Sequence, residues 1–212
     1  MISLSPEKGL IFRITHIDNV PWILANGLHS RSSVTRDENY REIGNPDLIE
    51  KRTHRLLPCA PGGTLSDYIP FYFTPYSPML LNIKTGYGGV KQTAMRDIAI
   101  LVASLPTLAA RGIRFLISDR HAYLTAAKFF GDLAGLPMLD WKILHARDFK
   151  RDANDPGKME RYNAEALIYR QLAAARLAGI ICYGFPQEAH LKGLLGAAGI
   201  EMVVRARADC YV

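Results

Sequence analysis

One carboxylate in this chain sits where carboxylates are uncommon. Glu165 lies within the apolar run 164–168, directly after a long polar stretch. Read as a strand, this run places Ala166 and Ile168 on one face and Glu165 with Leu167 on the other. An acid among apolar neighbours either pairs with a cation or takes part in chemistry. A solvated or ion-paired glutamate at a strand edge is the alternative, and this stretch alone does not decide between them.

The elements that could position this residue follow from the pattern of apolar residues. Short apolar, β-branched or aromatic runs predict strands at 10–16, 68–74, 97–105, 113–118, 164–169, 179–183 and 200–205. Helical spacing and capping residues predict helices at 20–26, 77–84 and 187–197, a short helix at 46–52, and helical or turn segments at 122–130 and 132–136. Short strands mixed with short helices, without regular alternation, favour an α+β fold. No glycine-rich phosphate motif of the Rossmann or P-loop type follows a predicted strand.

Two stretches lack this apolar periodicity. Residues 29–67 are rich in Ser, Arg, Asp, Asn, Pro and Gly and are too long for a simple connection. We therefore expect a functional loop or lid there. Residues 145–157 also have loop composition and end in the turn sequence Asp-Pro-Gly.

Length, cysteine content and charge narrow the class of protein. A chain of 212 residues fits a single domain, 1–212, with a substantial core. It has no run of about eighteen apolar residues and no secretory signal pattern, so we expect no membrane association. Cys59, Cys182 and Cys210 have no zinc-site spacing, so we expect reduced thiols, a cytoplasmic location and no metal. The net charge of +6 permits a polyanionic partner, although the cations are spread along the chain.

Several blocks of the sequence together resemble one known family. The blocks are Ile14–Val20 with Ile23–Leu28, then Gly63–Leu80, Ser118–Ala122 and Arg161–Leu167. The most specific is Tyr-Ile-Pro-Phe-Tyr-Phe-Thr-Pro-Tyr-Ser-Pro-Met-Leu at 68–80. In order and spacing, over nearly the whole chain, the blocks resemble the DarT family of DNA ADP-ribosyltransferase toxins.

This resemblance implies a fold and a reaction. The fold is that of ADP-ribosyltransferases, a split, mixed β-core with flanking short helices and long active-site loops, which holds NAD in a cleft as co-substrate. The reaction attaches ADP-ribose to thymine or guanine of single-stranded DNA, in a bacterial toxin–antitoxin setting where the antitoxin removes ADP-ribose from DNA. Glu165 matches the family's catalytic glutamate. A carboxylate there would stabilise the positive charge that builds on the ribose and take a proton from the attacking base.

The resemblance also implies an NAD cleft along the early blocks. The cofactor-binding residues that we expect are Arg13, Thr15, His16, Asn26, Gly27, Leu28, Tyr72, Phe73 and His121. Arg13 stands where the family often has histidine, and its forked donors suit a phosphate or ribose. Tyr72 and Phe73 point to opposite faces of their strand, so part of this aromatic run must belong to the core.

Two other positions depart from the family pattern. Pro75-Tyr76-Ser77-Pro78 replaces the usual Pro-Arg-Ser-Pro, so one cation is missing. Asn163 replaces the usual glutamine two residues before Glu165 and keeps a side-chain amide there.

By the same resemblance, residues 29–67 would fold over NAD and supply a catalytic arginine. We select Arg52 for this role and Arg55 as the second choice. A solvated surface charge is the alternative for each.

The segment 145–162 is where such transferases recognise their target. It has five basic and four acidic side chains, so its contacts to nucleic acid should be few and specifically placed. The predicted nucleic-acid contacts are Phe149, Lys150, Arg151, Arg161 and Tyr162. An aromatic side chain stacked on a base contributes about 1–3 kcal/mol. A single strand is expected, because pairing in a duplex hides the reactive nitrogens of a base.

Three functions stay open on the sequence. The first is transfer of ADP-ribose to a base of single-stranded DNA. The second is the same chemistry on RNA or on a protein side chain. The third is a catalytically silent nucleic-acid-binding module on this fold.

Overall fold

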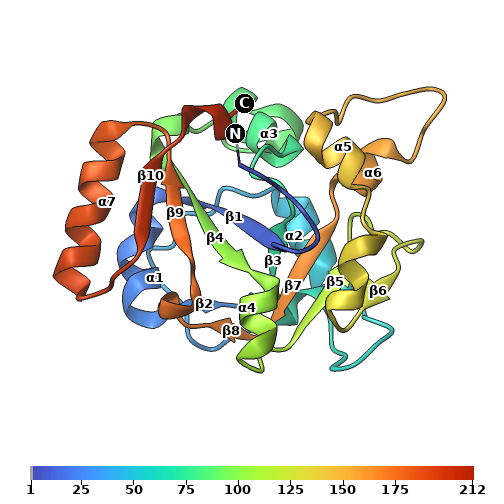
Figure 1. Cartoon of the computed structure of the whole chain (residues 1–212), viewed down its shortest axis with the longest axis horizontal. Helices are drawn as coiled ribbons and strands as arrows, with labels where there is room; N and C mark the ends of the chain where they lie inside the picture. The colour runs from blue at the N-terminus through green and yellow to red at the C-terminus, as the bar shows by residue number, and fades with distance from the viewer. Residues whose placement is uncertain (1) are drawn as a thin grey trace.

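A computed structural model describes residues 2–212 and arranges them around one mixed sheet (Figure 1). In sheet order its strands are β10 (Val203–Ala206), β9 (Gly179–Cys182), β4 (Ile98–Ser104), β1 (Leu10–His16), β3 (Tyr68–Tyr72), β7 (Glu165–Tyr169), β5 (Phe115–Ser118) and β6 (Phe129–Phe130). Strands β9 and β10 pair in parallel, and the other neighbouring strands pair antiparallel. A separate two-stranded sheet joins β2 (Leu28–His29) to β8 (Gln171–Leu172).

The helices lie around this sheet. They are α1 (Val20–Asn26), α2 (Pro46–His54), α3 (Pro78–Thr85), α4 (Leu105–Ala110), α5 (Trp141–Ala146), α6 (Lys158–Tyr162) and α7 (Phe185–Ala198). Helix α7 runs beside β9 and β10, whereas α5 and α6 lie at the opposite end of the molecule (Figure 1). The starts of α2 and α3 follow from local sequence. Asn45 and Ser77 each accept a hydrogen bond from a backbone N–H of the first turn, and a proline follows each cap.

The core forms on both faces of the sheet. Along β1, Ile11 points into the larger apolar cluster with Leu101 of β4, whereas Phe12 and Ile14 point into a second cluster with Leu80 of α3. This alternation is the period of a strand that is covered on both sides.

The sheet divides between β1 and β3. A single residue pair, Phe12 with Tyr72, joins these two strands, whereas β1 and β4 pair along their whole length. Pro70 of β3 has no N–H to offer, and its carbonyl accepts a hydrogen bond from Arg13 Nη1 at 2.9 Å instead of from a strand backbone. The expected α+β fold with a split, mixed β-core is therefore confirmed.

Some local expectations need correction. Of the two alternatives for residues 122–130, helix or turns, the structure has turns, and they lead into the unexpected short strand β6. Asp119 holds this hairpin, because its N–H donates to the Lys128 carbonyl and its Oδ1 accepts from the Lys128 N–H, at 3.1 and 3.0 Å. Helices α5 and α6 were not expected, because few buried residues mark them: Leu144 in α5, and Lys158 and Tyr162 in α6.

Candidate active site

Glu165 is the first residue of β7 and is held on both sides. Its sheet neighbours are Tyr72 of β3 and Ser118 of β5, and its N–H donates to Ser118 Oγ at 3.2 Å. The residue is 1% exposed. Its Oε1 accepts a hydrogen bond from the Ala122 N–H at 3.0 Å. The sheet and the 119–128 hairpin thus fix both the backbone and one oxygen of this carboxylate.

Helix α2 brings Arg52 to the same carboxylate. Arg52 Nη1 donates to Glu165 Oε1 at 3.3 Å, and Arg52 Nη2 lies 3.0 Å from Glu165 Oε2. The second contact is an ion pair without hydrogen-bond geometry, so Glu165 Oε2 has no hydrogen-bond donor within residues 2–212. A buried carboxylate oxygen without a donor is costly unless a ligand supplies one. Oε2 is therefore the atom to which a ligand hydroxyl can donate.

Two opposing effects set the charge of Glu165. Burial, the larger single effect, raises the pKa of the carboxyl group. The charge of Arg52 and the hydrogen bonds from Arg52 and Ala122 lower it, and together they hold the pKa below its ordinary value. Glu165 is consequently ionised at neutral pH although it is buried.

His121 lies beside Glu165 as a neutral ring. Its Nδ1 is 3.7 Å from Glu165 Oε1, but the same nitrogen accepts a hydrogen bond from the Tyr123 N–H at 3.2 Å. Burial lowers the pKa of His121 more than the charge of Glu165 raises it. We infer a neutral imidazole with its proton on Nε2, which is not an ion-pair partner of Glu165.

These residues line a cavity of about 460 Å³. It opens where β1 and β3 separate, and the segment 29–52 covers it. Tyr72 contributes a neutral hydroxyl, because burial, followed by the charge of Glu165, raises its pKa to about 12. Arg13 and Arg36 add cations on the lining, and Arg13 Nε has no hydrogen-bond partner within the described residues.

The structure places part of the expected NAD site on this cavity. Arg13, Leu28, Tyr72 and His121 line it. Arg52 also lines it, whereas Arg55 points away and donates to the Leu124 carbonyl at 3.2 Å. Arg52 is thus the arginine of the covering segment that meets the carboxylate.

Thr15, His16 and Phe73 lie elsewhere, which corrects their expected contacts with NAD. Thr15 of β1 is buried and accepts a hydrogen bond from Asn19 at 3.1 Å. His16 Nδ1 accepts the Asp18 N–H at 3.2 Å, so this ring caps a short helical turn. Phe73 is fully buried in the core, because its strand face is the one that turns inward.

Asn26 and Gly27 need the same correction. Asn26 is exposed, and its amide donates to the Trp22 carbonyl at 3.1 Å. Gly27 has φ of 84°, and a Cβ there would lie 2.7 Å from the Leu172 carbonyl oxygen. The glycine permits the close approach of β2 to β8 and does not contact the cavity.

Other lining residues were not expected from the sequence. Trp22, Tyr40, Ile43 and Met79 all face the cavity. Met79 falls inside a family block and Trp22 lies between two of them, but Tyr40 and Ile43 lie in the polar stretch 29–67. For Tyr40 and Ile43, the one signal available in the sequence was an aromatic or aliphatic side chain isolated in a polar stretch.

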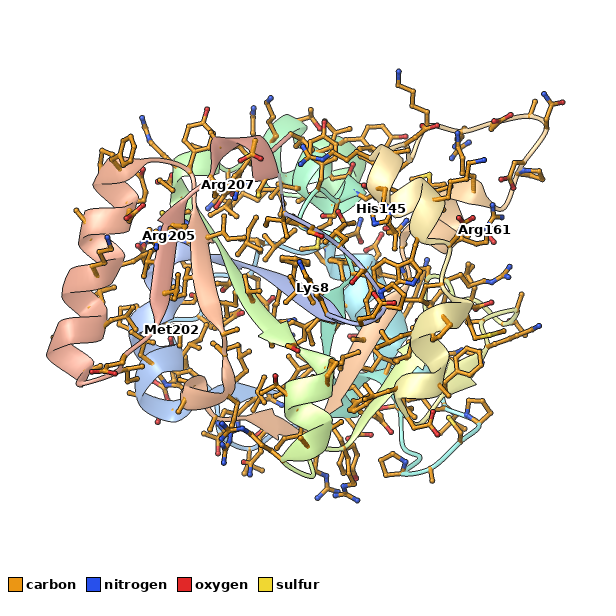
Figure 2. The ribbon with its side chains drawn as sticks, in the orientation of Figure 1. Lys8, His145, Arg161, Met202, Arg205 and Arg207 are labelled. Carbon is orange, nitrogen blue, oxygen red and sulfur yellow. The ribbon has the colours of Figure 1, made fainter. Side chains whose placement is uncertain are left out.

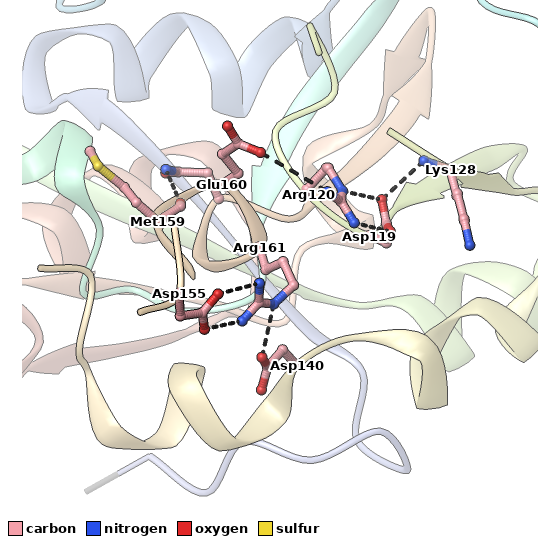
Figure 3. A network of polar contacts seen from close by, with 9 residues as sticks. Asp119, Arg120, Lys128, Asp140, Asp155, Met159, Glu160 and Arg161 are labelled. Atoms are coloured by element: carbon pink, nitrogen blue, oxygen red, sulfur yellow. Dashed lines mark hydrogen bonds and ion pairs between the residues drawn. The ribbon is translucent and has the colours of Figure 1, made fainter. Parts of the chain in front are cut away.

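The segment 145–162 is held together by internal ion pairs. Arg161 makes two hydrogen bonds to Asp155, at 3.0 and 2.6 Å, and one to Asp140 at 3.1 Å (Figure 3). Lys158 Nζ lies 2.9 Å from Asp148 Oδ2 and 3.7 Å from Asp152 Oδ2. The charge of Arg161 is therefore already neutralised, which corrects its expected role in binding nucleic acid.

The aromatic residues of this segment are also structural. Tyr162 is 1% exposed, and its hydroxyl donates to the Tyr76 carbonyl at 2.7 Å. Phe149 packs against the rings of Tyr76 and Tyr162, with centroids 5.9 and 5.3 Å apart. Burial corrects the expected stacking of Tyr162 on a base, whereas Phe149 is only half-buried and its stacking stays a prediction. Lys150 and Arg151 are exposed, and neither has a carboxylate within 4.0 Å in the described chain.

Two further findings concern the chain as a whole. From residue 2 to residue 212, no three His, Cys, Asp or Glu side chains are grouped to hold a metal ion. No helix in that range is long and apolar enough to cross a membrane. The basic side chains Lys8, Arg161 and Arg205 lie on separate parts of the molecule (Figure 2), so the positive charge is dispersed.

Comparison with known proteins settles the family. A family model described as ssDNA thymidine ADP-ribosyltransferase, DarT, matches residues 12–212. The chain belongs to the DarT family. The DNA ADP-ribosyl transferase of Escherichia coli O127:H6 (strain E2348/69 / EPEC) is 48% identical to it over 209 residues, 99% of this chain and 96% of that protein. The resemblance seen in the sequence is confirmed.

Solved structures of DarT proteins have the same fold. DarT of Thermus sp. 2.9 in complex with ADP-ribosylated ssDNA has a TM-score of 0.90 and 31% identity, and the match covers 100% of both chains. The complex of that DarT with NAD+ has a TM-score of 0.85 and covers 98% of this chain and 100% of that one. A DNA ADP-ribosyl transferase-DNA ADP-ribosyl glycohydrolase fusion protein of Thermosipho africanus is 24% identical over 201 residues, 93% of this chain and 48% of the fusion.

Proposed function

We propose that this chain transfers ADP-ribose from NAD to a base of single-stranded DNA, and that the base is thymine. One observation carries the proposal: Glu165 is buried and ionised, with one oxygen free of donors at the wall of a cavity. The family description, which names single-stranded DNA and thymidine, supports both the strand and the base. The Thermus relative in complex with ADP-ribosylated ssDNA supports the reaction.

Glu165 supplies the charge that the reaction needs. Nicotinamide leaves the ribose as a neutral group, and positive charge builds on the sugar. A carboxylate fixed in a low-dielectric wall stabilises that charge more strongly than it would in water. Glu165 Oε2 accepts from a ribose hydroxyl, while Arg52 and the Ala122 N–H hold Oε1 in place. The same carboxylate takes the proton that the attacking base nitrogen loses.

The cavity suits a dinucleotide in size and in polar groups. Its volume of about 460 Å³ lies in the usual range of small-molecule sites. In this proposal Arg13 supports the pyrophosphate, because it lines the cavity and its Nε has no hydrogen-bond partner within the described residues. Residues 29–67 form the cover of NAD in this proposal, and 1–212 form one catalytic domain.

The target strand reaches Glu165 from the side of the segment 145–162. In this proposal Lys150 and Arg151 contact phosphates, because they are the cations of this segment that are exposed and unpaired within residues 2–212. Phe149 and Tyr162 hold the segment against Tyr76, and Arg161 holds it through Asp140 and Asp155.

The biological setting follows the family. A DNA-modifying transferase requires an opposing activity in its own cell, and the Thermosipho relative carries a DNA ADP-ribosyl glycohydrolase in the same chain. We therefore propose a toxin whose antitoxin removes ADP-ribose from DNA, with both acting in the cytoplasm.

The test incubates the protein with labelled NAD and with separate pools of DNA, RNA and protein. We expect label on single-stranded DNA that contains thymine and none on the same strand annealed to its complement. Glu165→Gln keeps the shape of the side chain but removes the charge, and should reduce transfer at least a hundredfold. Glu201→Gln, the same change at an exposed position, is the matched control and should transfer normally.

The alternatives have distinct outcomes in this experiment. Label on RNA or protein alone would assign the same chemistry to another acceptor. Binding of single-stranded DNA without any label would indicate a silent nucleic-acid-binding module. Full transfer by Glu165→Gln would contradict the proposed role of the carboxylate.

A further inference from the structure

Part of the block Ile14–Val20 has no place in the active site described above. Asn19 is 1% exposed and does not line the cavity. A buried amide must be satisfied by hydrogen bonds, and two of the three that Asn19 makes go to Arg41 in the covering segment. We propose that Asn19 is a positioning residue that fixes this segment and, through it, places Arg52 against Glu165. The inference deepens the proposed function and rests on it.

Asn19 clamps both backbone groups of one residue. Its Oδ1 accepts the Arg41 N–H at 2.8 Å, and its Nδ2 donates to the Arg41 carbonyl at 3.0 Å. Its Nδ2 also donates to Thr15 Oγ1 at 3.1 Å. The amide of Asn19 therefore pairs with the backbone of Arg41 as a neighbouring strand would, and it links β1 to a segment that forms no strand there.

The neighbouring side chains strengthen this clamp. Thr15 Oγ1 lies 3.5 Å from the hydroxyl of Tyr40, which lines the cavity. Arg41 Nη2 lies 2.9 Å from Asp18 Oδ2, but both side chains are about half exposed, so this pair adds little. The buried contacts of Asn19 and Thr15 are the ones that hold residues 40 and 41.

Helix α2 depends on such a clamp because few contacts of its own hold it. None of its residues is buried, so packing of an apolar face does not fix it. It is tethered near its ends, by Asn45 Nδ2 to the Gly88 carbonyl at 2.6 Å and by Arg55 to the Leu124 carbonyl. Residues 42–45 run from the clamp to the helix and line the cavity. A shift at Arg41 is therefore transmitted to the helix that bears Arg52.

Asn19→Ala removes the clamp, and a structural measurement tests it without any transfer reaction. Trypsin cleaves after Arg36 and Arg41, which lie in the covering segment. Loss of two backbone hydrogen bonds should raise the rate of this cleavage about tenfold or more under native conditions. Asn39→Ala is the matched control, since Asn39 is exposed in the same segment and makes no side-chain hydrogen bond within the described residues. The control should be cleaved at the rate of the original protein.

A double-mutant cycle on kcat then tests whether Asn19 acts through Arg52. We expect Asn19→Ala to lower kcat for transfer about tenfold at saturating NAD. Arg52→Lys keeps a cation and a measurable rate, and Asn19→Ala should add little to its loss, because both changes disturb one contact. Independent, multiplying losses would overturn the proposed path through Arg52.

Two other results decide the matter if the first variant folds poorly or transfers nothing. Thr15→Val keeps the core volume but removes one partner of Asn19, and should raise tryptic cleavage in the same direction by a smaller factor. Unchanged cleavage after Arg36 and Arg41 in both variants would overturn the clamp. If no protein transfers ADP-ribose to DNA, the cleavage result still stands, and the proposed function alone fails.

Discussion

At the scale of single residues, the site depends on a carboxylate that keeps its charge while buried. Burial by itself favours the protonated acid. In Glu165 the guanidinium of Arg52 and the N–H of Ala122 reverse this preference, so the pKa lies below its ordinary value. The charge of Arg52 is the largest of the effects that let this buried carboxylate stay ionised.

Arg52→Gln tests this dependence. Without the cation, burial raises the pKa of Glu165, and the carboxylate takes up a proton at higher pH. We expect the acid limb of the pH profile of kcat/KM to move to higher pH and transfer at pH 7 to fall at least tenfold. Binding of NAD, measured by calorimetry, should change less than transfer.

The comparison for this prediction is Arg55→Gln. Arg55 lies in the same segment but donates to the Leu124 carbonyl, not to Glu165. The acid limb of the kcat/KM profile of Arg55→Gln should stay at the pH of the original protein. An unmoved acid limb in Arg52→Gln would show that Arg52 does not control the ionisation of Glu165.

The sequence predicts the residues of this site unevenly, for a physical reason. The apolar run around Glu165 is a local signal, and a family block contains it. Arg52 lies outside the blocks and was selected because the family takes an arginine from the segment 29–67. The partners of Arg161 are not local, because Asp140 and Asp155 reach it only after the chain folds. An arginine that binds DNA and one that is neutralised by two aspartates look alike in a sequence.

At the scale of elements, the segment between α5 and α6 is a braced loop. Lys158 forms an ion pair with Asp148, and Arg161 forms ion pairs with Asp140 and Asp155. Phe149 and Tyr162 pack against Tyr76. Such a loop can present its remaining cations at fixed positions. Lys150 and Arg151 are therefore expected to make defined contacts with phosphate.

Arg151→Ala tests the contact with phosphate. Each phosphate neutralised on a single strand contributes about −0.7 to the slope of log affinity against log salt. We expect Arg151→Ala to make this slope shallower by about 0.7, measured by fluorescence anisotropy with a labelled oligonucleotide. Arg205→Ala removes an exposed cation on β10, far from this segment, and should leave the slope unchanged. An unaltered slope in Arg151→Ala would place the strand elsewhere.

At the scale of the whole molecule, the class of fold could be predicted but the strand order could not. Apolar runs locate most strands of the large sheet. The neighbours of β1 are β3 and β4, and the opening between β1 and β3 depends on a proline and an arginine that meet across the sheet. Periodicity along the chain has no information about such pairs.

The pKa shifts predict how the stability of the molecule responds to pH. Burial, the largest effect, lowers the pKa values of His16 and His121 from 6.5, so neutral rings stabilise the fold above that pH. The hydrogen bonds from Arg207 lower the pKa of Asp209 from 3.8 to about 2, and the pKa of Glu165 is lowered from 4.5. In each case the folded state binds fewer protons than the unfolded chain.

The free energy of unfolding should therefore decrease as the pH falls. A first decline is expected below about 6.5 from the histidines, and a second from about 4.5 towards 2 from the carboxylates. Urea unfolding at a series of pH values measures this dependence. A free energy that rises between pH 7 and pH 5 would contradict the assigned charge states.

The central position of β1 affects how the molecule is made. This strand comes early in the chain, yet one partner is at 98–104, and the strand that begins with Glu165 comes later still. A sheet whose strands are so far apart in the sequence cannot form while the ribosome is still synthesising the first half of the chain. Until Glu165 has been synthesised and its strand has paired with β3 and β5, the active site is incomplete, so a chain still on the ribosome cannot transfer ADP-ribose.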